Sequence, residues 1–156
     1  MNQAFFDLLP EAIFWLVLLI VSIILVKKTG FSKKPLNTAR NSILSMNKKM
    51  DEFFTPDTEK KRFVKPTGLK VLAEGRKITS ISKDAKKAHD ALAVFCYDNR
   101  LNKESAETLK TVDTVMDLLY KLSKNVFSNE KDYNKALSSL MKETDRAVKQ
   151  IQDIVK

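Results

Sequence analysis

The chain has 156 residues, 44% of them hydrophobic, and 28 Lys or Arg against 19 Asp or Glu give it a net charge of +9. Only three Gly and four Pro are present, too few for the regular turns of a β-rich fold or for a glycine-rich phosphate loop. The composition therefore predicts an all-α protein and excludes P-loop and dinucleotide-binding enzymes.

Residues 12–26 form an apolar run in which Ser22 is the only polar side chain. As a helix this run rises about 22 Å, and flanking residues extend it toward the roughly 30 Å hydrocarbon core of a bilayer. A buried core helix and a cleaved signal peptide are the alternatives. A signal peptide is disfavoured because no Lys or Arg precedes the run. We therefore expect residues 1–28 to be a transmembrane anchor.

The charge on either side of this run predicts its orientation. Four lysines follow it closely, namely Lys27, Lys28, Lys33 and Lys34. Since Lys and Arg favour the cytoplasmic side, we expect a single-pass protein of the cell or inner membrane. Its N-terminus would face out and its C-terminal domain would be cytoplasmic. The single Cys96 fits a reducing compartment, because it can form no intrachain disulfide.

Two segments follow the anchor. Gly30 and Pro35 indicate a linker at residues 29–36, and a helix is expected over residues 37–54. Its apolar side chains follow a 3-4-3 spacing typical of one helix face, at Ile43, Met46, Met50 and Phe53. The sequence leaves open whether this helix is a stalk or the first helix of a bundle.

The polar connection that follows contains one aromatic residue among four basic ones: Phe63 with Lys60, Lys61, Arg62 and Lys65. Phe63 either docks on the bundle or inserts shallowly among anionic headgroups, to which each basic residue near the surface would add about 1 kcal/mol. A solvated loop without a role is the third interpretation. The candidate lipid- or partner-binding residues are Lys27, Lys28, Lys33, Lys34, Lys60, Lys61, Arg62, Phe63 and Lys65.

Residues 69–156 contain three further amphipathic segments. In the first, core positions recur every seven residues, at Val71, Ile78, Ala85 and Leu92, interleaved with Ile81, Ala88 and Phe95. This helix is expected from Leu69, with a later start at Ser80 or Ser82 as the alternative. Residues 97–102 are expected to form a turn.

The second segment, residues 103–127, places one stripe of apolar side chains at Leu109, Val112, Met116, Leu119 and Val126, widened by Val115, Leu118 and Leu122. The third is preceded by Ser128 and Asn129, which can cap it, and carries Leu137, Leu140, Thr144, Ala147, Ile151 and Ile154. Short turns between long helices favour antiparallel neighbours. Residues 37–156 are thus predicted to be a basic three- or four-helix domain, with coiled-coil pairing to a partner chain left open.

Catalytic chemistry is poorly represented. His89 is the only histidine, and it lies seven residues from Cys96, about 10 Å along a helix, too far for a Cys–His dyad. No Glu-x-x-His motif accompanies the carboxylates, as di-metal helical bundles require. We therefore expect no metal site, no cofactor and no enzymatic activity.

The excess of positive charge lies close to the apolar run. Residues 27–87 contain 17 Lys or Arg against 6 Asp or Glu, whereas residues 88–156 contain 11 of each. This placement favours anionic lipid headgroups over nucleic acid as the partner. We expect a membrane-anchored helical scaffold or adaptor that binds a protein partner or forms a homo-oligomer. The alternative is an oligomerising membrane-perturbing or pore-forming effector of the phage or defence type.

Overall fold

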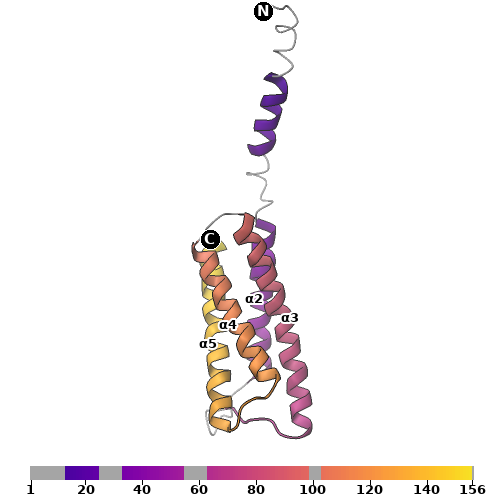
Figure 1. Ribbon diagram of the computed structural model, residues 1–156, viewed down its shortest axis with the longest axis vertical. Coiled ribbons are helices and arrows are strands. Elements are labelled where there is room, and N and C mark those ends of the chain that lie inside the picture. Colours follow the sequence, from indigo (N-terminus) through magenta and orange to yellow (C-terminus); the bar gives the residue numbers. More distant parts are fainter. Residues whose placement is uncertain (1–12, 25–32, 55–62, 99–102, 156) are drawn as a thin grey trace, which may run out of the picture. The chain divides into compact units, whose positions relative to one another are not determined.

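The computed structural model describes residues 13–24, 33–54, 63–98 and 103–155. These residues contain helices and no strand, which confirms the all-α prediction. The chain divides into two compact units, Met1–Lys34 and Pro35–Lys156. Four labelled helices follow one another along the chain (Figure 1): α2 at Lys33–Phe53, α3 at Leu69–Asp98, α4 at Lys103–Ser123 and α5 at Glu130–Val155.

In the first unit, residues 13–24 are helical. Eleven of these twelve residues are large hydrophobics, each exposed over 43–63% of its surface. The twelfth, Ser22, donates its hydroxyl to the Leu18 carbonyl at 2.7 Å. Among the helices of the described part of the chain, none combines the length and the apolarity needed to cross a membrane. Residues 12, 25 and 26 of the predicted span lie outside the described residues.

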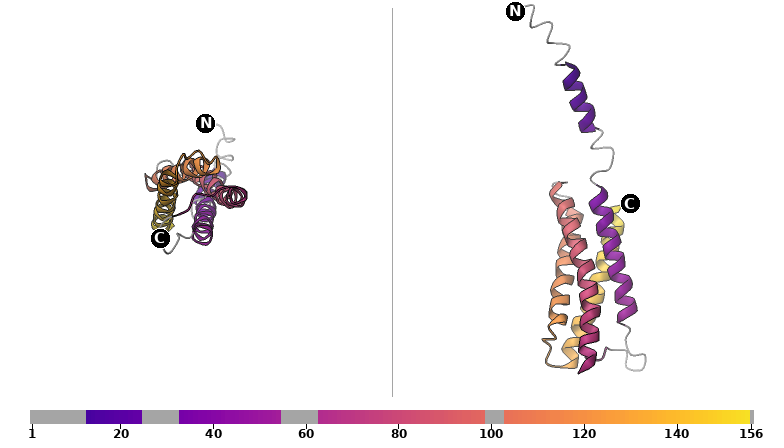
Figure 2. Two further views of the ribbon diagram at one scale, coloured as in Figure 1. Left: turned by 90° about the horizontal axis from the view of Figure 1, so that it is seen from below. Right: turned by 90° about the vertical axis from the view of Figure 1, so that its right-hand side faces the viewer.

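The second unit is a helical bundle in which consecutive helices run in opposite directions (Figures 1 and 2). Seen along the bundle, α2 and α4 face each other diagonally, with α3 and α5 on either side. The segment left open as a stalk is therefore a fourth bundle helix. It begins at Lys33, inside the range expected to be a linker. Pro35 fits this early start, because a first-turn residue needs no N–H partner.

The bundle core forms along the predicted stripes. On α3, every predicted core position from Ile78 to Phe95 is buried, and the helix begins at Leu69, as expected. On α2 the buried side chains include Ile43, Met46 and Met50, and Phe53 is half-buried. Phe54, which the sequence pattern did not single out, is buried as well. These side chains belong to one continuous apolar core.

The predicted stripe of α4 needs two corrections. The helix ends at Ser123, after which Asn125 turns the chain with a φ of 48°. Val126 therefore lies beyond the helix and is exposed, so its placement on the core face was wrong. At the other end, the core face carries three buried hydroxyl residues that a hydrophobic pattern overlooks: Ser105, Thr108 and Thr111.

The start of α5 is capped as the sequence predicts. The side-chain oxygen of Asn129 accepts a hydrogen bond of 2.8 Å from the Asp132 backbone N–H. This bond occupies one of the N–H groups that lack an intrahelical partner. Glu130 and Asp132 lie in the first turn, where the helix dipole favours negative charge. The turn predicted at residues 97–102 is wrong at its first two positions, because α3 continues to Asp98. Residues 99–102 lie outside the described residues.

Candidate interaction surfaces of the bundle

The structure places four of the nine candidate binding residues. Lys33 and Lys34 are exposed in the first turn of α2, whereas Phe63 and Lys65 lie beyond its far end, next to the start of α3. The two pairs are separated by the length of α2, whose 21 residues rise about 30 Å. They do not form one site. The other five lie outside the described residues: Lys27, Lys28, Lys60, Lys61 and Arg62.

Phe63 docks on the bundle. Its backbone N–H donates to Asn134 Oδ1 at 2.5 Å, and Asn134 Nδ2 donates back to the Phe63 carbonyl. Its side chain is half-buried against the apolar core. These contacts support the interpretation that Phe63 docks on the bundle.

Lys65 also helps to hold the connection before α3 against the bundle. Its ammonium group donates to the Phe127 carbonyl in the turn before α5, and the neighbouring Pro66 is buried. On α3, Lys77 donates to the Phe53 carbonyl at 3.3 Å and lies 5.8 Å from the centre of the Phe53 ring. These lysines therefore join separate segments of the bundle.

A pocket of about 310 Å³ lies between these segments. Phe53, Phe54, Phe63, Tyr133 and Leu137 contribute its apolar wall. The Tyr133 hydroxyl donates to Glu74 Oε2 at 2.5 Å. Burial, followed by the hydrogen bond to Glu74 and its negative charge, raises the pKa of Tyr133 well above its ordinary value. The phenol is therefore held protonated as a donor.

His89 and Cys96 were considered for catalysis in the sequence analysis, and the acidic residues for metal binding. His89 is half-buried, with Nε2 3.2 Å from Asp113 on α4 and Nδ1 3.2 Å from Asp90. Burial raises the pKa of Cys96, which lowers its thiolate fraction. Within the ranges that the structure describes, no three His, Cys, Asp or Glu side chains gather closely enough to hold a metal ion.

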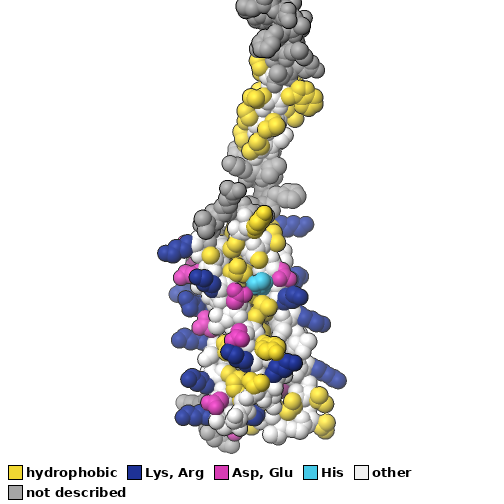
Figure 3. Space-filling model, in the orientation of Figure 1, with side chains coloured by type: hydrophobic (Ala, Val, Ile, Leu, Met, Phe, Trp, Pro, Cys, Tyr) yellow, Lys and Arg dark blue, Asp and Glu magenta, His cyan; other side chains and the backbone are white. Residues whose placement is uncertain are grey.

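The basic residues favour one half of the bundle. Helices α2 and α3 carry five and six Lys or Arg, against two and four Asp or Glu. Helix α4 has three against four, and α5 has five of each. In Figure 3, Lys and Arg side chains project from both sides of the bundle. The two halves differ in the balance of charge, with 11 basic against 6 acidic residues on α2 and α3 and 8 against 9 on α4 and α5. Among the four bundle helices, the net positive charge therefore lies on α2 and α3.

The outward face of α3 also carries apolar residues that the sequence analysis did not select. Leu69, Leu72, Val94 and Tyr97 are exposed over 85%, 67%, 51% and 85% of their surfaces. A second 3-4 pattern, out of phase with the heptad of the core, would have revealed them. It runs through Leu69, Leu72, Arg76, Ser80, Lys83, Lys87, Asp90, Val94 and Tyr97.

Comparisons of the chain with protein-family models, with curated proteins and with solved structures gave no match.

Proposed function

We propose that this chain is a membrane-anchored helical adaptor, in which residues 12–26 form the anchor and residues 33–156 form a module for protein interaction. The observation that carries the proposal is the helical segment at residues 13–24, whose eleven large hydrophobic side chains are exposed on every side. A helix that is apolar all round requires either a large protein core or a bilayer around it. The described side chains of the bundle core lie between Leu36 and Ile151 and belong to the second unit.

The lysines that follow the apolar run support an orientation with the bundle in the cytoplasm. An anchor confines the bundle to the membrane surface and so raises its effective concentration for membrane-bound partners. Several polar side chains of the bundle hold its segments together, which supports a binding role without catalysis. Asn134 binds the backbone of Phe63 in the connection before α3, and Lys49 pairs with Asp84 at 2.7 Å between α2 and α3.

The adaptor and the pore-forming effector differ in what the apolar run must do. In an adaptor, replacing residues 12–26 by an unrelated anchor of equal length preserves activity, because the run serves only as a tether. In a pore, the same replacement abolishes activity while the bundle stays folded and membrane-bound. The measurement is the cellular phenotype of the exchanged chain, with membrane fractionation and proteolysis of the bundle as controls. Loss of activity in a folded, membrane-bound chain would contradict the adaptor.

A further inference from the structure

We propose that the outward face of α3 binds the surface of an anionic bilayer along its length, which lays the bundle flat on the membrane. We call this surface the α3 outer face and define it by Leu69, Leu72, Arg76, Lys83, Lys87, Asp90, Val94 and Tyr97. The proposal deepens the function proposed above by naming a lipid partner for the bundle itself. It needs no contribution from residues 12–26, so the two proposals fail separately.

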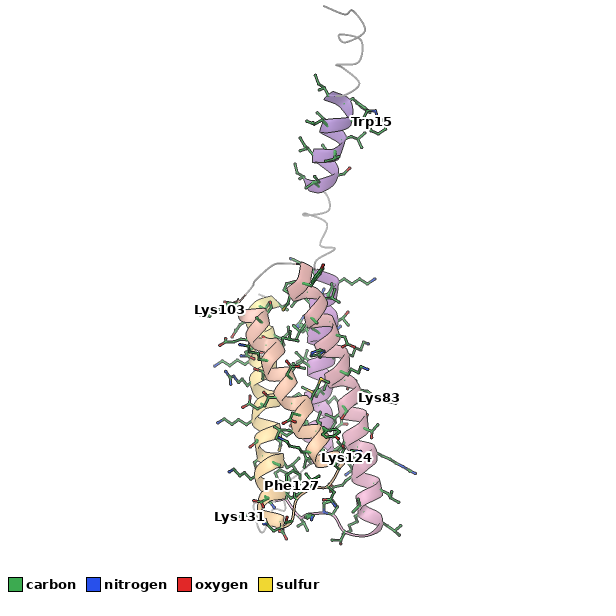
Figure 4. All side chains as sticks on the ribbon, viewed as in Figure 1. Trp15, Lys83, Lys103, Lys124, Phe127 and Lys131 are labelled. Carbon is green, nitrogen blue, oxygen red and sulfur yellow. The ribbon has the colours of Figure 1, made fainter. Side chains whose placement is uncertain are left out.

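The arrangement of side chains on this face is the first argument. Four of the seven large hydrophobic residues exposed in the described part of the bundle lie here: Leu69 and Leu72 at one end, Val94 and Tyr97 at the other. The two ends are separated by 28 residues, about 42 Å of helix. Basic residues occupy the stretch between them. Figure 4 shows one of these, Lys83, on the side of α3 that faces away from the other helices.

Charge is the second argument. Of the three acidic residues of α3 whose side chains are described, two point to partners inside the bundle. Glu74 accepts the Tyr133 hydroxyl, and Asp84 accepts hydrogen bonds from Lys49 at 2.7 Å and Ser45 at 2.8 Å. Asp90, which lies 3.2 Å from His89 Nδ1, is the one acid on the outer face within the described residues. Arg76, Lys83 and Lys87 thus dominate its charge.

Together, the exposed apolar residues and the excess of basic residues favour a bilayer as the partner of this face. Apolar side chains with long basic ones between them are the composition of helices that lie in the membrane interface, where the basic stems extend to the headgroups. A polyanion alone would leave Leu69, Leu72 and Tyr97 in water. A shallow depression of about 540 Å³ beside Gly75 and Arg76 on this face would suit an acidic amphipathic helix instead. That occupant is an outcome of the test.

The test uses residues 33–156, which contain the whole buried core from Leu36 to Ile151. Vesicles of phosphatidylcholine with about 30% phosphatidylserine should bind this fragment more strongly than pure phosphatidylcholine, and less strongly as salt rises. L69S/L72S should weaken binding about tenfold, because two aliphatic side chains leave the interface. R76E/K83E should weaken it more than tenfold, since each basic residue near the surface contributes about fivefold.

Two matched variants change the same properties elsewhere. Y120S/V126S removes two exposed apolar side chains from α4 and the following turn, and K142E/K149E makes the same charge change on α5, across the bundle from α3. Each should alter binding about twofold or less. Losses equal to those of the α3 variants would overturn the assignment of this face.

Fluorescence tests the lengthwise contact. Trp15 is the only tryptophan of the chain, so the fragment contains none. L72W and Y97W should both shift to shorter wavelength on anionic vesicles and be quenched by brominated lipid, whereas V126W should stay in water. A shift at one end only, or at neither, overturns the flat arrangement. Failure of the wild-type fragment to bind at low salt overturns the lipid partner and leaves an acidic helix as the occupant.

Discussion

The hydroxyl of Tyr133 on α5 donates a hydrogen bond of 2.5 Å to Glu74 Oε2 on α3, which joins these helices across one end of the bundle. Tyr133 is almost completely buried, and its ring meets Phe127 edge to face at 6.2 Å. Tyr133 therefore combines a hydrogen bond to the acidic side chain of Glu74 with aromatic packing against Phe127. Such bonds contribute more to stability than those between neutral groups.

Replacing Tyr133 by Phe keeps the ring and leaves Glu74 without its donor. We expect the free energy of unfolding to fall by about 1–3 kcal/mol, measured by urea denaturation of residues 33–156. The exposed Tyr120 provides the control, and Y120F should change stability by no more than about 0.5 kcal/mol. An unchanged stability of Y133F would show that the bond contributes nothing.

The raised pKa of Tyr133 predicts how stability depends on pH. Burial and Glu74 raise this pKa above the value of about 10 expected for the unfolded chain. Because the folded state holds its proton more tightly, the contribution of Tyr133 is complete below pH 10 and is lost as pH rises above it. Wild-type stability should fall above pH 10 by up to about 1.4 kcal/mol per pH unit more than that of Y133F. Parallel pH curves would contradict this.

Asn134 fastens the connection before α3 by two hydrogen bonds to the backbone of Phe63. Changing Asn134 to Ala should expose the Phe63 amide and accelerate its hydrogen exchange at least tenfold. Asn129 is the matched control on the same helix. N129A removes the cap of α5 and should cost about 1 kcal/mol, yet leave the Phe63 amide protected. Equal exchange in both variants would show general loosening instead.

Two glycines at the start of α3 should respond in opposite directions to alanine. Gly75 lies within the helix, and an added Cβ would meet nothing within 4 Å. G75A should therefore stabilise the bundle by about 0.5–1 kcal/mol and raise Tm by a few degrees. Gly68 has a φ of +58°, so G68A should cost about 1 kcal/mol. Thermal denaturation of both variants decides the matter, and a lower Tm for G75A would reveal a contact at that position.

Orientation can be measured on intact cells. With Cys96 changed to Ala, a cysteine at position 2 should react with an impermeant maleimide, and one at position 129 should react only after permeabilisation. This result follows from the lysines on the C-terminal side of the apolar run. Labelling at position 129 alone would place the bundle outside and reverse the predicted topology.

Much of the bundle is predictable because its helices bury a regular apolar stripe. Ile81, Ala85 and Ala88 on α3 are completely buried, as their heptad positions predict. The same reasoning failed at Val126, because spacing does not show that α4 ends at Ser123. Thr108 was missed for a different reason. A threonine can enter a core when its hydroxyl bonds the carbonyl four residues earlier, as Thr108 does with Glu104 at 2.9 Å.

The candidate interaction surfaces were less predictable, and for Phe63 the reason is a contact between distant segments. Phe63 and Asn134 are 71 positions apart, so no local pattern distinguishes a docked Phe63 from one that enters lipid. The outer face of α3 was hidden for another reason. Its Leu69 and Leu72 belong to a second 3-4 pattern that is mostly polar between them and Val94, so the stronger core heptad of the same helix drew attention away from them.

Extraction of membranes with alkaline carbonate tests most directly whether residues 12–26 anchor the chain. The full chain should stay in the membrane pellet, while residues 33–156 should be released, because alkaline carbonate removes proteins that are bound to the membrane surface without spanning the bilayer. L16K/I20K should also be released, since each charge near the centre of a span costs about 2.5–3.5 kcal/mol. Release of the unaltered full chain into the carbonate supernatant would contradict the membrane anchor and, with it, the proposed adaptor.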